Sequence, residues 1–396
     1  MSPEIQVKAI TLTHGNVGLD YISRNAVSLL HVMSEYQKFA GIQQEPDLPV
    51  LAVGASKPLQ IEQINAGEVH GKDGLGEIYE VGWLARSPLL NRIYGKQLFD
   101  GPADWEDQLL HKPETETDVG KTFRTTSRDA ADEILFQLKE APPLTISICA
   151  VGPLTNIALA YQRDPVVFSR AKRIVIMGGA IHQAGNVTPM AEFNFRADPH
   201  AADLVMTASK GFENTEKGYQ RRLELLQRGK QAPCHIVILP LDAGDDGCVS
   251  REDYLKHIVP LKRANPLTSF CNTFLVWFFN RCCTLFETDT LAIYDAYTIL
   301  LLIDMVMDEG NGSSEEFNKL WYYEYLDLHV ETGGVYTQGM CCYDRRLGPK
   351  TSTWGEPNCV QVMLRGNGKR FNRILLNRVF NANITEENGF NMIYKH

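Results

Sequence analysis

The chain has 396 residues, of which 44% are hydrophobic and 22% are charged, and this balance is typical of a globular protein. Its net charge of −9 argues against a nucleic-acid-binding surface, which requires clustered basic side chains. No apolar run approaches the roughly 18 residues of a membrane-spanning helix, and the first residues lack the basic and apolar regions of a signal peptide.

Cysteine usage indicates a reducing compartment. The nine cysteines include the adjacent pairs Cys282-Cys283 and Cys341-Cys342, and no C-x-x-C spacing occurs. This pattern fits neither a disulfide framework nor a zinc site. We therefore expect reduced, mostly buried thiols in a cytoplasmic protein.

Apolar runs alternate with helical periodicity along most of the chain. The short apolar runs predict strands at Ile5–Thr13, Val50–Val53, Thr145–Val151, Ile174–Met177 and Ile236–Leu241. The helical patterns predict helices at Asp20–Phe39, Thr155–Arg163, Pro199–Ala208 and Ala292–Asp304. This alternation predicts an α/β fold with a mostly parallel sheet and helices on both faces. In such sheets ligands bind beyond the carboxyl ends of the strands.

Two charged stretches, at about residues 86–129 and 210–231, interrupt this rhythm. We interpret them as surface insertions in a single domain that spans residues 1–396. The C-terminal part predicts further elements: strands at Tyr322–Glu331, Val335–Asp344 and Cys359–Leu364, and a helix from Phe371.

The segment from Ile174 to Ala202 is the most informative of the chain. An apolar run stops at Gly178-Gly179, and the following loop presents Asn186, Glu192 and Asn194. Amide and carboxylate groups form hydrogen bonds with hydroxyls, so this loop suits a polyol such as a sugar. An ordinary βα loop with polar tips is the alternative, and the pattern alone does not decide between them.

The same segment closely resembles the ribose-binding segment of inosine-uridine nucleoside N-ribohydrolases. The resemblance begins with Met177-Gly178-Gly179, Gly185–Pro189 and Ala191–Asn194. Further motifs similar to those of the family follow one another in the family's order: Thr13–Asn16, Pro49–Leu59, His70–Gly76, Gly152–Asn156, Leu239–Asp242 and Tyr294–Ala296. Residues 331–346 resemble the longer fungal members. The shared order carries the resemblance more than any single motif does.

The resemblance implies a single nucleoside-hydrolase-like domain with a Rossmann-like sheet. It also implies hydrolysis of the N-glycosidic bond of ribonucleosides, purine or pyrimidine, to free base and ribose. In the family a calcium ion orients the ribose and lowers the pKa of a bound water, which then attacks the anomeric carbon. By this resemblance Asp295 is a calcium ligand through its carboxylate, and Val151 through its main-chain carbonyl. Taken alone, Asp295 reads as a helix N-cap.

The remaining site residues follow from the same resemblance. Met177, Asn186, Glu192 and Asn194 would bind the ribose. Asn16 would lie beside the catalytic water, and His70 would approach the base. The implied partner is a small-molecule ribonucleoside. Relatives form dimers or tetramers, so a homo-oligomer is a further possibility, although the sequence carries no interface signature.

Two departures from the family pattern stand out. Tyr294 occupies the place of a histidine, and a tyrosine with a pKa near 10 is a weaker general acid at neutral pH. His14, His70 or His182 could take over that role.

The second departure concerns the family's D-x-D-x-x-x-D-D segment, which supplies calcium ligands and the general base ahead of the strand that matches Ile5–Thr13. The sequence begins at Met1 without it. Three explanations compete: an incomplete gene product, a catalytically impaired relative that only binds nucleoside or ribose, or a replacement of the carboxylates by another element. We favour the first, because the other site residues are in place.

Overall fold

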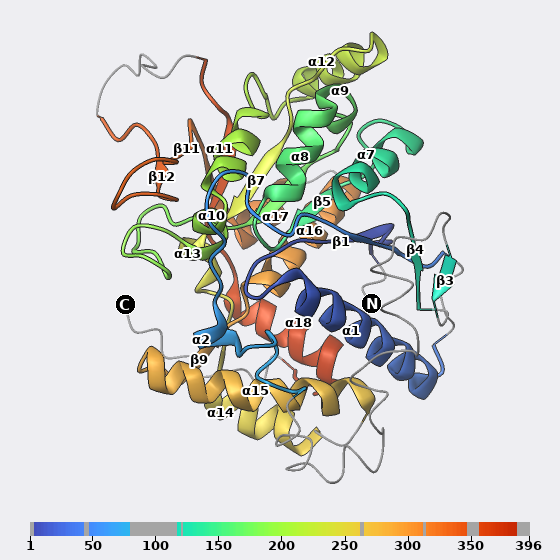
Figure 1. Ribbon diagram of the computed structural model, residues 1–396, viewed down its shortest axis with the longest axis vertical. Helices are drawn as coiled ribbons and strands as arrows, with labels where there is room; N and C mark the ends of the chain where they lie inside the picture. Colours follow the sequence, from blue (N-terminus) through green and yellow to red (C-terminus); the bar gives the residue numbers. More distant parts are fainter. Residues whose placement is uncertain are drawn as a thin grey trace.

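The computed structural model describes residues 4–42, 47–79, 117–119, 122–261, 265–311, 314–346 and 356–385. Most of the predicted insertion at residues 86–129 lies outside these ranges. Within them the chain forms parallel sheets flanked by helices, as predicted (Figure 1).

The main sheet is in two parts. The first has the order β1 (Ala9–Leu12), β2 (Val50–Val53), β4 (Phe123–Thr125) and β3 (Thr117–Val119). The second has the order β10 (Tyr322–Leu326), β13 (Val360–Arg365), β7 (Ile236–Leu239), β6 (Ile174–Met177) and β5 (Ile148–Ala150). Only β3 and β10 of these described strands run antiparallel to their neighbours. Two short antiparallel ladders join β8 (Cys248–Ser250) to β9 (Thr290–Ala292), and β11 (His329–Val330) to β12 (Cys341–Cys342).

Helices cover both faces of these sheets. Their bounds are α1 (Leu19–Ala40), α2 (Gly67–His70), α7 (Ala130–Glu140), α8 (Thr155–Arg163), α9 (Pro165–Phe168), α10 (Phe193–Ala197), α11 (Pro199–Thr207), α12 (Glu216–Gln227), α13 (Leu241–Gly244), α14 (Arg251–Asp253), α15 (Pro266–Leu285), α16 (Tyr294–Asn311), α17 (Ser314–Leu320) and α18 (Gly368–Phe380). A π-helical turn at Tyr254–Ile258 and a 3-10 turn at Val259–Leu261 follow α14.

Burial on both faces explains why the central strands are continuous apolar runs. Side chains alternate along a strand, so Ile174 and Ile176 of β6 enter one core with α7, α8 and α11. Val175, between them, enters the opposite core with α16, α17 and α18. All residues of β6 and β7 are at most 3% exposed. Such two-sided burial favours apolar residues at every position.

Several predicted bounds are confirmed, and others need correction. The strands β2 and β6 and the helix α8 have their predicted bounds. The strand at Ile236 ends at Leu239, because Leu241 already begins α13. The predicted insertion contains β4, which pairs in parallel with β2 and is therefore part of the sheet.

The predicted pair of C-terminal strands is confirmed for β11 and β12, which pair with each other, and is wrong for the first half of the stretch 322–331. The stretch 322–331 divides into β10, which pairs with β13, and β11, which pairs with β12. Asp327 and Leu328 separate the two strands, and Asn358 donates a hydrogen bond to each of them. Its main-chain N donates to the side chain of Asp327, and its Nδ2 donates to the carbonyl of Leu328. Val335 and Tyr336 lie in a turn instead of a strand and are 90% and 86% exposed.

The sheet is interrupted between β1 and β5. Among the described strands, β1 pairs only with β2, and β5 pairs only with β6. The residues of β5 are half-buried, in contrast to those of β6. Two neighbouring parallel edges therefore present backbone groups that no described strand satisfies.

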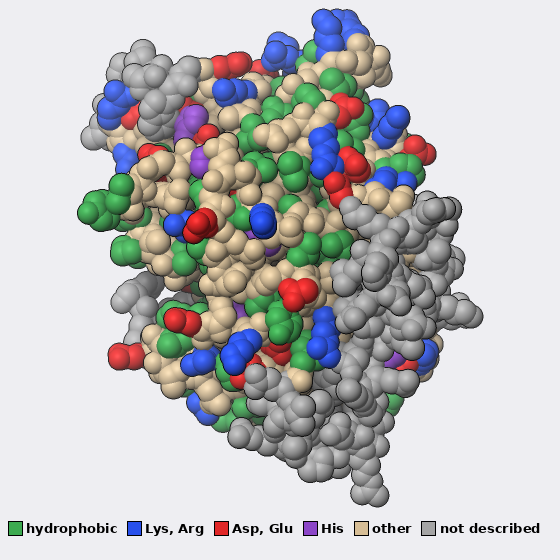
Figure 2. All heavy atoms as spheres, viewed as in Figure 1, with side chains coloured by type: hydrophobic (Ala, Val, Ile, Leu, Met, Phe, Trp, Pro, Cys, Tyr) green, Lys and Arg blue, Asp and Glu red, His purple; other side chains and the backbone are tan. Residues whose placement is uncertain are grey.

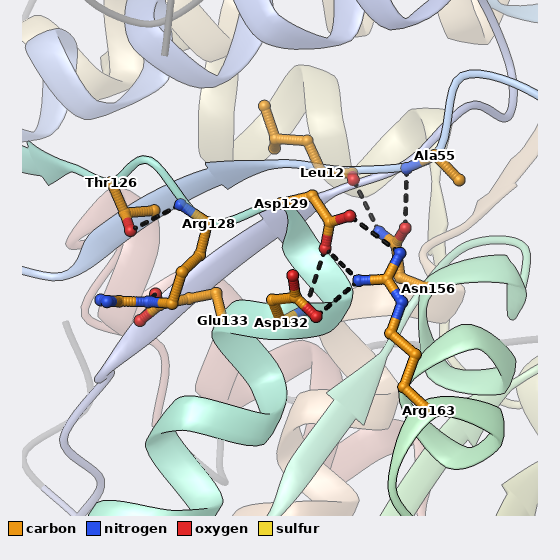
Figure 3. A network of polar contacts seen from close by, with 9 residues as sticks. All are labelled: Leu12, Ala55, Thr126, Arg128, Asp129, Asp132, Glu133, Asn156 and Arg163. Carbon is orange, nitrogen blue, oxygen red and sulfur yellow. Dashed lines mark hydrogen bonds and ion pairs between the residues drawn. The ribbon is translucent and has the colours of Figure 1, made fainter. Parts of the chain in front are cut away.

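Asn156 ties the two parts together at their carboxyl ends (Figure 3). Its Nδ2 donates to the carbonyl of Leu12 at 2.7 Å, and its Oδ1 accepts from the amide of Ala55 at 2.8 Å. Gly54 permits this approach, because a Cβ there would lie 2.2 Å from the Leu12 oxygen and 2.3 Å from Nδ2 of Asn156. The loops after β1 and β2 are thus fixed against the start of α8.

Two global properties bear on the partners. No helix within the described ranges is long and apolar enough to cross a membrane. On the face drawn in Figure 2, Lys and Arg side chains are scattered among Asp and Glu instead of forming one basic patch.

Replacing Asn156 by alanine should destabilise the fold, because two buried backbone groups lose their partner. We expect a loss of about 2–5 kcal/mol in the free energy of unfolding, measured by denaturant titration. Asn318→Ala, at an exposed position of α17, is the matched control and should change stability little. Equal stability of the two variants would contradict the bridging role.

Candidate functional site

The sequence-predicted residues lie on loops at the carboxyl ends of the strands. Asn16 follows β1, and Val151 follows β5. Met177 ends β6, Asn186 and Glu192 lie in the loop that leads to α10, and Asn194 lies in the first turn of α10. Tyr294 and Asp295 open α16.

Glu192 organises the loop after β6. Its side chain is 1% exposed, and it accepts hydrogen bonds from three main-chain amides: Asn194 at 2.8 Å, Gly179 at 2.9 Å and Phe195 at 3.2 Å. Burial raises the pKa of this carboxyl to about 7, although the three bonds act in the opposite direction. Glu192 thus folds the loop, and most of its acceptor capacity is used within the protein.

The two asparagines also support the loop. Nδ2 of Asn194 donates to the carbonyl of Met177 at 3.1 Å and contacts its sulfur at 3.0 Å. Oδ1 of Asn186 accepts from the amide of Phe193 at 2.9 Å, and Asn186 is exposed. Met177, Glu192 and Asn194 are therefore brought together, with Asn186 at the open side.

Tyr294 and Asp295 join this group from α16. The ring of Tyr294 packs with Met177, Ala180 and Leu241. The carboxyl of Asp295 is open to solvent, yet protein surrounds it closely, and this desolvation raises its pKa to about 6.

Val151 lies on the same side of the sheet as Asp295. It directly follows β5 and is 39% exposed. Cys149 on that strand has a pKa raised to about 12, first by burial and second by the charge of Asp295. The two predicted calcium ligands therefore share the open edge of β5.

Asn16 and His70 form a second group. The carbonyl of Asn16 accepts from the amide of Ala66, which precedes α2, at 2.9 Å. The ring of His70 meets Phe278 of α15 edge-on, with centroids 5.3 Å apart. Burial lowers the pKa of His70 to about 4, so its imidazole is neutral at pH 7.

Asp73 shapes the loop that follows His70. Its Oδ1 accepts from the amides of Leu75 and Glu77, both at 2.8 Å. Gly76 has a φ of 72° and packs against Trp277, where a Cβ would lie 2.7 Å from the side chain. Both the positive φ and the close approach to Trp277 therefore require glycine at position 76.

The two other histidines have structural partners. His14 is fully buried, and its Nε2 lies 2.9 Å from the hydroxyl of Thr155, which donates to Asp198. His182 is exposed, and its Nδ1 lies 3.2 Å from the hydroxyl of Tyr343. His14 is thus enclosed in the core below the loops.

The described residues do not make a calcium site. Calcium takes about six to eight oxygen ligands. Asp295 lies near Cys149 of β5, and Val151 directly follows that strand, but Glu192 is occupied by main-chain amides. In the part of the chain that the structure describes, no three His, Cys, Asp or Glu residues are placed to hold a metal.

The sequence singled out the stretch Asp242–Gly247 as a weak calcium-loop candidate but did not predict the partners of its aspartates. Asp242, in the P-L-D motif, accepts from the amides of Ile181 and His182, both at 2.8 Å. Asp245 accepts from the hydroxyl of Tyr294 at 2.8 Å. The spacing of Asp242 and Asp245 by one helical turn was the available signal, but their partners lie far along the chain.

Glu192 should make stability pH-dependent. Its carboxyl stays protonated in the folded state up to about pH 7, whereas it ionises near its ordinary value when unfolded. Stability should therefore fall as pH rises between about 4.5 and 7, by about 3 kcal/mol from this group. Thermal melts across this range should show a shallower fall for Glu192→Gln, while Glu224→Gln at an exposed position keeps the wild-type slope. Identical slopes for all three proteins would refute the assignment.

Comparisons with known proteins agree with this arrangement. Residues 1–373 match the family model of the inosine-uridine preferring nucleoside hydrolases. An uncharacterised protein of Schizosaccharomyces pombe is 35% identical over 207 residues, which are 52% of this chain and 51% of that protein. Uridine nucleosidase 1 of Arabidopsis thaliana is 35% identical over 209 residues, 52% of this chain and 47% of its own length. The chain spans about half the length of the curated relatives it matches.

Solved structures of the same fold cover nearly the whole chain. A plant nucleoside hydrolase has a TM-score of 0.67 at 21% identity, and the match covers 96% of this chain and 92% of that one. A purine-preferring ribonucleoside hydrolase from Gardnerella vaginalis has a TM-score of 0.66 at 18% identity, with the same coverage of 96% and 92%. The fold is confirmed, and the chain belongs to the inosine-uridine preferring nucleoside hydrolase family.

Proposed function

We propose that this protein binds ribonucleosides and hydrolyses their N-glycosidic bond to ribose and free base. The loop from Met177 to Asn194 carries this proposal: it is folded around the buried Glu192, with Tyr294 and Asp295 beside it at the carboxyl end of the sheet. Relatives bear the names uridine nucleosidase and pyrimidine-specific ribonucleoside hydrolase, which supports a nucleoside as substrate.

The proposed roles follow from the chemistry of each group. Bond cleavage in a glycoside develops positive charge on the sugar, which a nearby carboxylate stabilises. Above its pKa of about 6, Asp295 is ionised and supplies that charge. Asn186 and Asn194 offer amide groups to the ribose hydroxyls, and Asn16 offers one to the attacking water.

His70 is assigned to the base. Its imidazole is neutral at pH 7, so it forms hydrogen bonds to a heterocycle without placing a charge beside it. The edge-on contact with Phe278 fixes the plane of the ring. The side chains of α2 and α15 would then enclose the base, opposite the ribose loop.

The gap between β1 and β5 is proposed to receive a further parallel strand that carries carboxylates. Both edges are unpaired within the described sheets. Two side-chain atoms beside the gap, Oγ1 of Thr13 and Nδ1 of His14, are buried and have no hydrogen-bond partner among the described residues. Asp295 and Val151 lie near β5, and the described residues offer no cluster of acidic side chains that would complete a calcium site. The alternative hypothesis is that the chain binds nucleoside or ribose without hydrolysing the nucleoside.

The proposed setting is nucleoside catabolism or salvage in the cytoplasm. The sequence predicted mostly buried thiols, but only three of the nine cysteines are buried and the other six are half-buried. Buried thiols such as Cys234 and Cys271 have pKa values raised to about 12 by burial, which keeps them unreactive.

Base release from inosine and uridine, with and without added calcium, tests the proposed activity. Asp295→Asn should lower kcat at least about 100-fold, because the charge that stabilises the cationic ribosyl group is lost. Asp289→Asn, at an exposed position before β9, is the matched control and should retain activity.

The outcome separates the two readings. Turnover that requires Asp295 supports the enzyme. Nucleoside binding without turnover, detected by calorimetry, supports the binding-only reading. If the chain neither binds nor hydrolyses either nucleoside, the proposal fails.

The strand proposal predicts a change in amide exchange. A chain extended at its N-terminus by the family's D-x-D-x-x-x-D-D segment should protect amides of β1 and β5 at least about tenfold more than the chain that begins at Met1, because their edges become paired. The same extension should produce a calcium-dependent rise in Tm. A version with asparagine in place of each aspartate should keep the protection and lose the calcium effect. Unchanged exchange in β1 and β5 would exclude a strand in the gap.

A further inference from the structure

The hydroxyl of Tyr294 has a fixed partner. It donates to Oδ1 of Asp245 at 2.8 Å. The ring of Tyr294 packs directly against Gly244, where a Cβ would lie 2.5 Å from the Cδ1 atom of the ring. Tyr294 is therefore positioned by both its ring and its hydroxyl, and these contacts come from two adjacent residues of the loop after β7.

Asp245 is itself held from the other side. Burial raises the pKa of its carboxyl, and the side chain of Gln183, in the loop after β6, acts in the opposite direction. Asp242, one turn earlier, anchors that same loop through the amides of Ile181 and His182. The Tyr294–Asp245 pair thus joins the segments that follow β6 and β7 to the start of α16.

The phenol lies against the ribose loop. Its ring packs with Met177, whose sulfur contacts Nδ2 of Asn194. A nucleoside held by Asn194 would therefore contact Tyr294. The direction of the tyrosine hydrogen bond decides whether Tyr294 donates to this nucleoside or accepts from it.

A tyrosine hydroxyl has one hydrogen and can also accept. An ionised carboxylate can only accept, so Tyr294 must give its hydrogen to Asp245 while this bond lasts. The oxygen of Tyr294 is then left as an acceptor toward the ligand. In this arrangement the phenol has no proton to give to a departing base.

We infer that Asp245 is a positioning residue that fixes Tyr294 as a hydrogen-bond acceptor, so that this end of the site selects nucleosides presenting an N–H or O–H donor. The inference rests on the proposed function, since it states what Tyr294 does toward a bound nucleoside. It assigns to Tyr294 a part in recognition instead of the proton donation considered from the sequence.

The first arm of the test examines the hydrogen bond without any ligand. Thermal unfolding is measured for wild type, Tyr294→Phe, Asp245→Ala and the double variant. If the bond exists, the double variant has a Tm close to that of the less stable single variant. Additive losses in Tm would overturn the inference at this step.

The second arm uses calorimetry with inosine, 5′-deoxyinosine and purine riboside. The second ligand lacks the 5′ hydroxyl donor, and the third lacks the N–H donor of the hypoxanthine ring. Wild type should bind at least one of them about tenfold more weakly than inosine, because the Tyr294 oxygen loses its partner. Tyr294→Phe should remove this preference, and Asp245→Ala should weaken it.

Two further variants sharpen this arm. Asp245→Asn keeps an acceptor oxygen, so it should retain the preference to within about threefold. Tyr219→Phe on α12 is the matched tyrosine control and should behave as wild type. A preference that survives in Tyr294→Phe would refute the recognition role.

Leaving-group dependence separates recognition from acid catalysis. A p-nitrophenyl riboside departs without protonation, so a proton donor matters little to its hydrolysis. With Tyr294 as an acceptor, Tyr294→Phe should raise KM for inosine and leave kcat for inosine within about threefold of wild type. A fall in kcat for inosine at unchanged KM, with p-nitrophenyl riboside hydrolysed as by wild type, would make Tyr294 the general acid and overturn the inference.

Failure of the proposed function gives a different result. If wild type binds none of the three nucleosides, the function and the ligand part of the inference both fall, whereas the Tm cycle still decides the Tyr294–Asp245 bond. If wild type binds inosine and discriminates among the ligands through other residues, the inference alone falls.

Discussion

Two-sided burial of β6 and β7 is the constraint on which the rest of the molecule depends. Their side chains enter cores on both faces, so these strands cannot shift register without exposing apolar surface. Because their neighbours run in parallel, the loops that leave them emerge at one edge. The loop after β6 and the Asp242–Asp245 turn are therefore side by side, and Asp242 accepts from two amides of that loop. The buried strands thus bring the polar loop residues together, and contacts within the loops then set the positions of their side chains.

A second layer of structure consists of carboxylates that bind main-chain amides. Glu192, Asp242 and Asp73 each accept from two or three of them, and each shapes a loop near the predicted site. A carboxylate with several amide donors fixes many backbone dihedrals with one side chain. Loops of this kind are rigid without regular secondary structure, which allows small polar groups such as Asn194 to be placed accurately.

The sequence predicts those strands and helices that interactions between neighbouring residues determine. The run from Ile174 to Met177 ends at glycines, and the structure has a strand with those bounds. In contrast, β4 has only three residues, including the polar Arg124, and exists because β2 offers an edge. The pairing of β10 with β13 likewise depends on residues that are distant along the chain. Neither could be read from periodicity.

The site residues likewise divide into those that motifs predicted and those whose contacts depend on the fold. Motif order placed Met177, Asn194 and Asp295 on loops that meet at one end of the sheet. It did not reveal that Glu192 uses its oxygens within the protein, because this depends on the fold of α10. Nor did it reveal the Tyr294–Asp245 contact, which joins residues 49 positions apart. Partners at that separation are set by topology and not by spacing.

The unpaired edges of β1 and β5 have a consequence for the behaviour of the chain in solution. A parallel edge with free amides and carbonyls is a template for a strand from any source, including another molecule of the same kind. Asn156 holds the carboxyl end of β1 against the start of α8, so the two edges keep their places even though no described strand lies between them. Within the described part of the chain, association between molecules would therefore begin at the edges of β1 and β5.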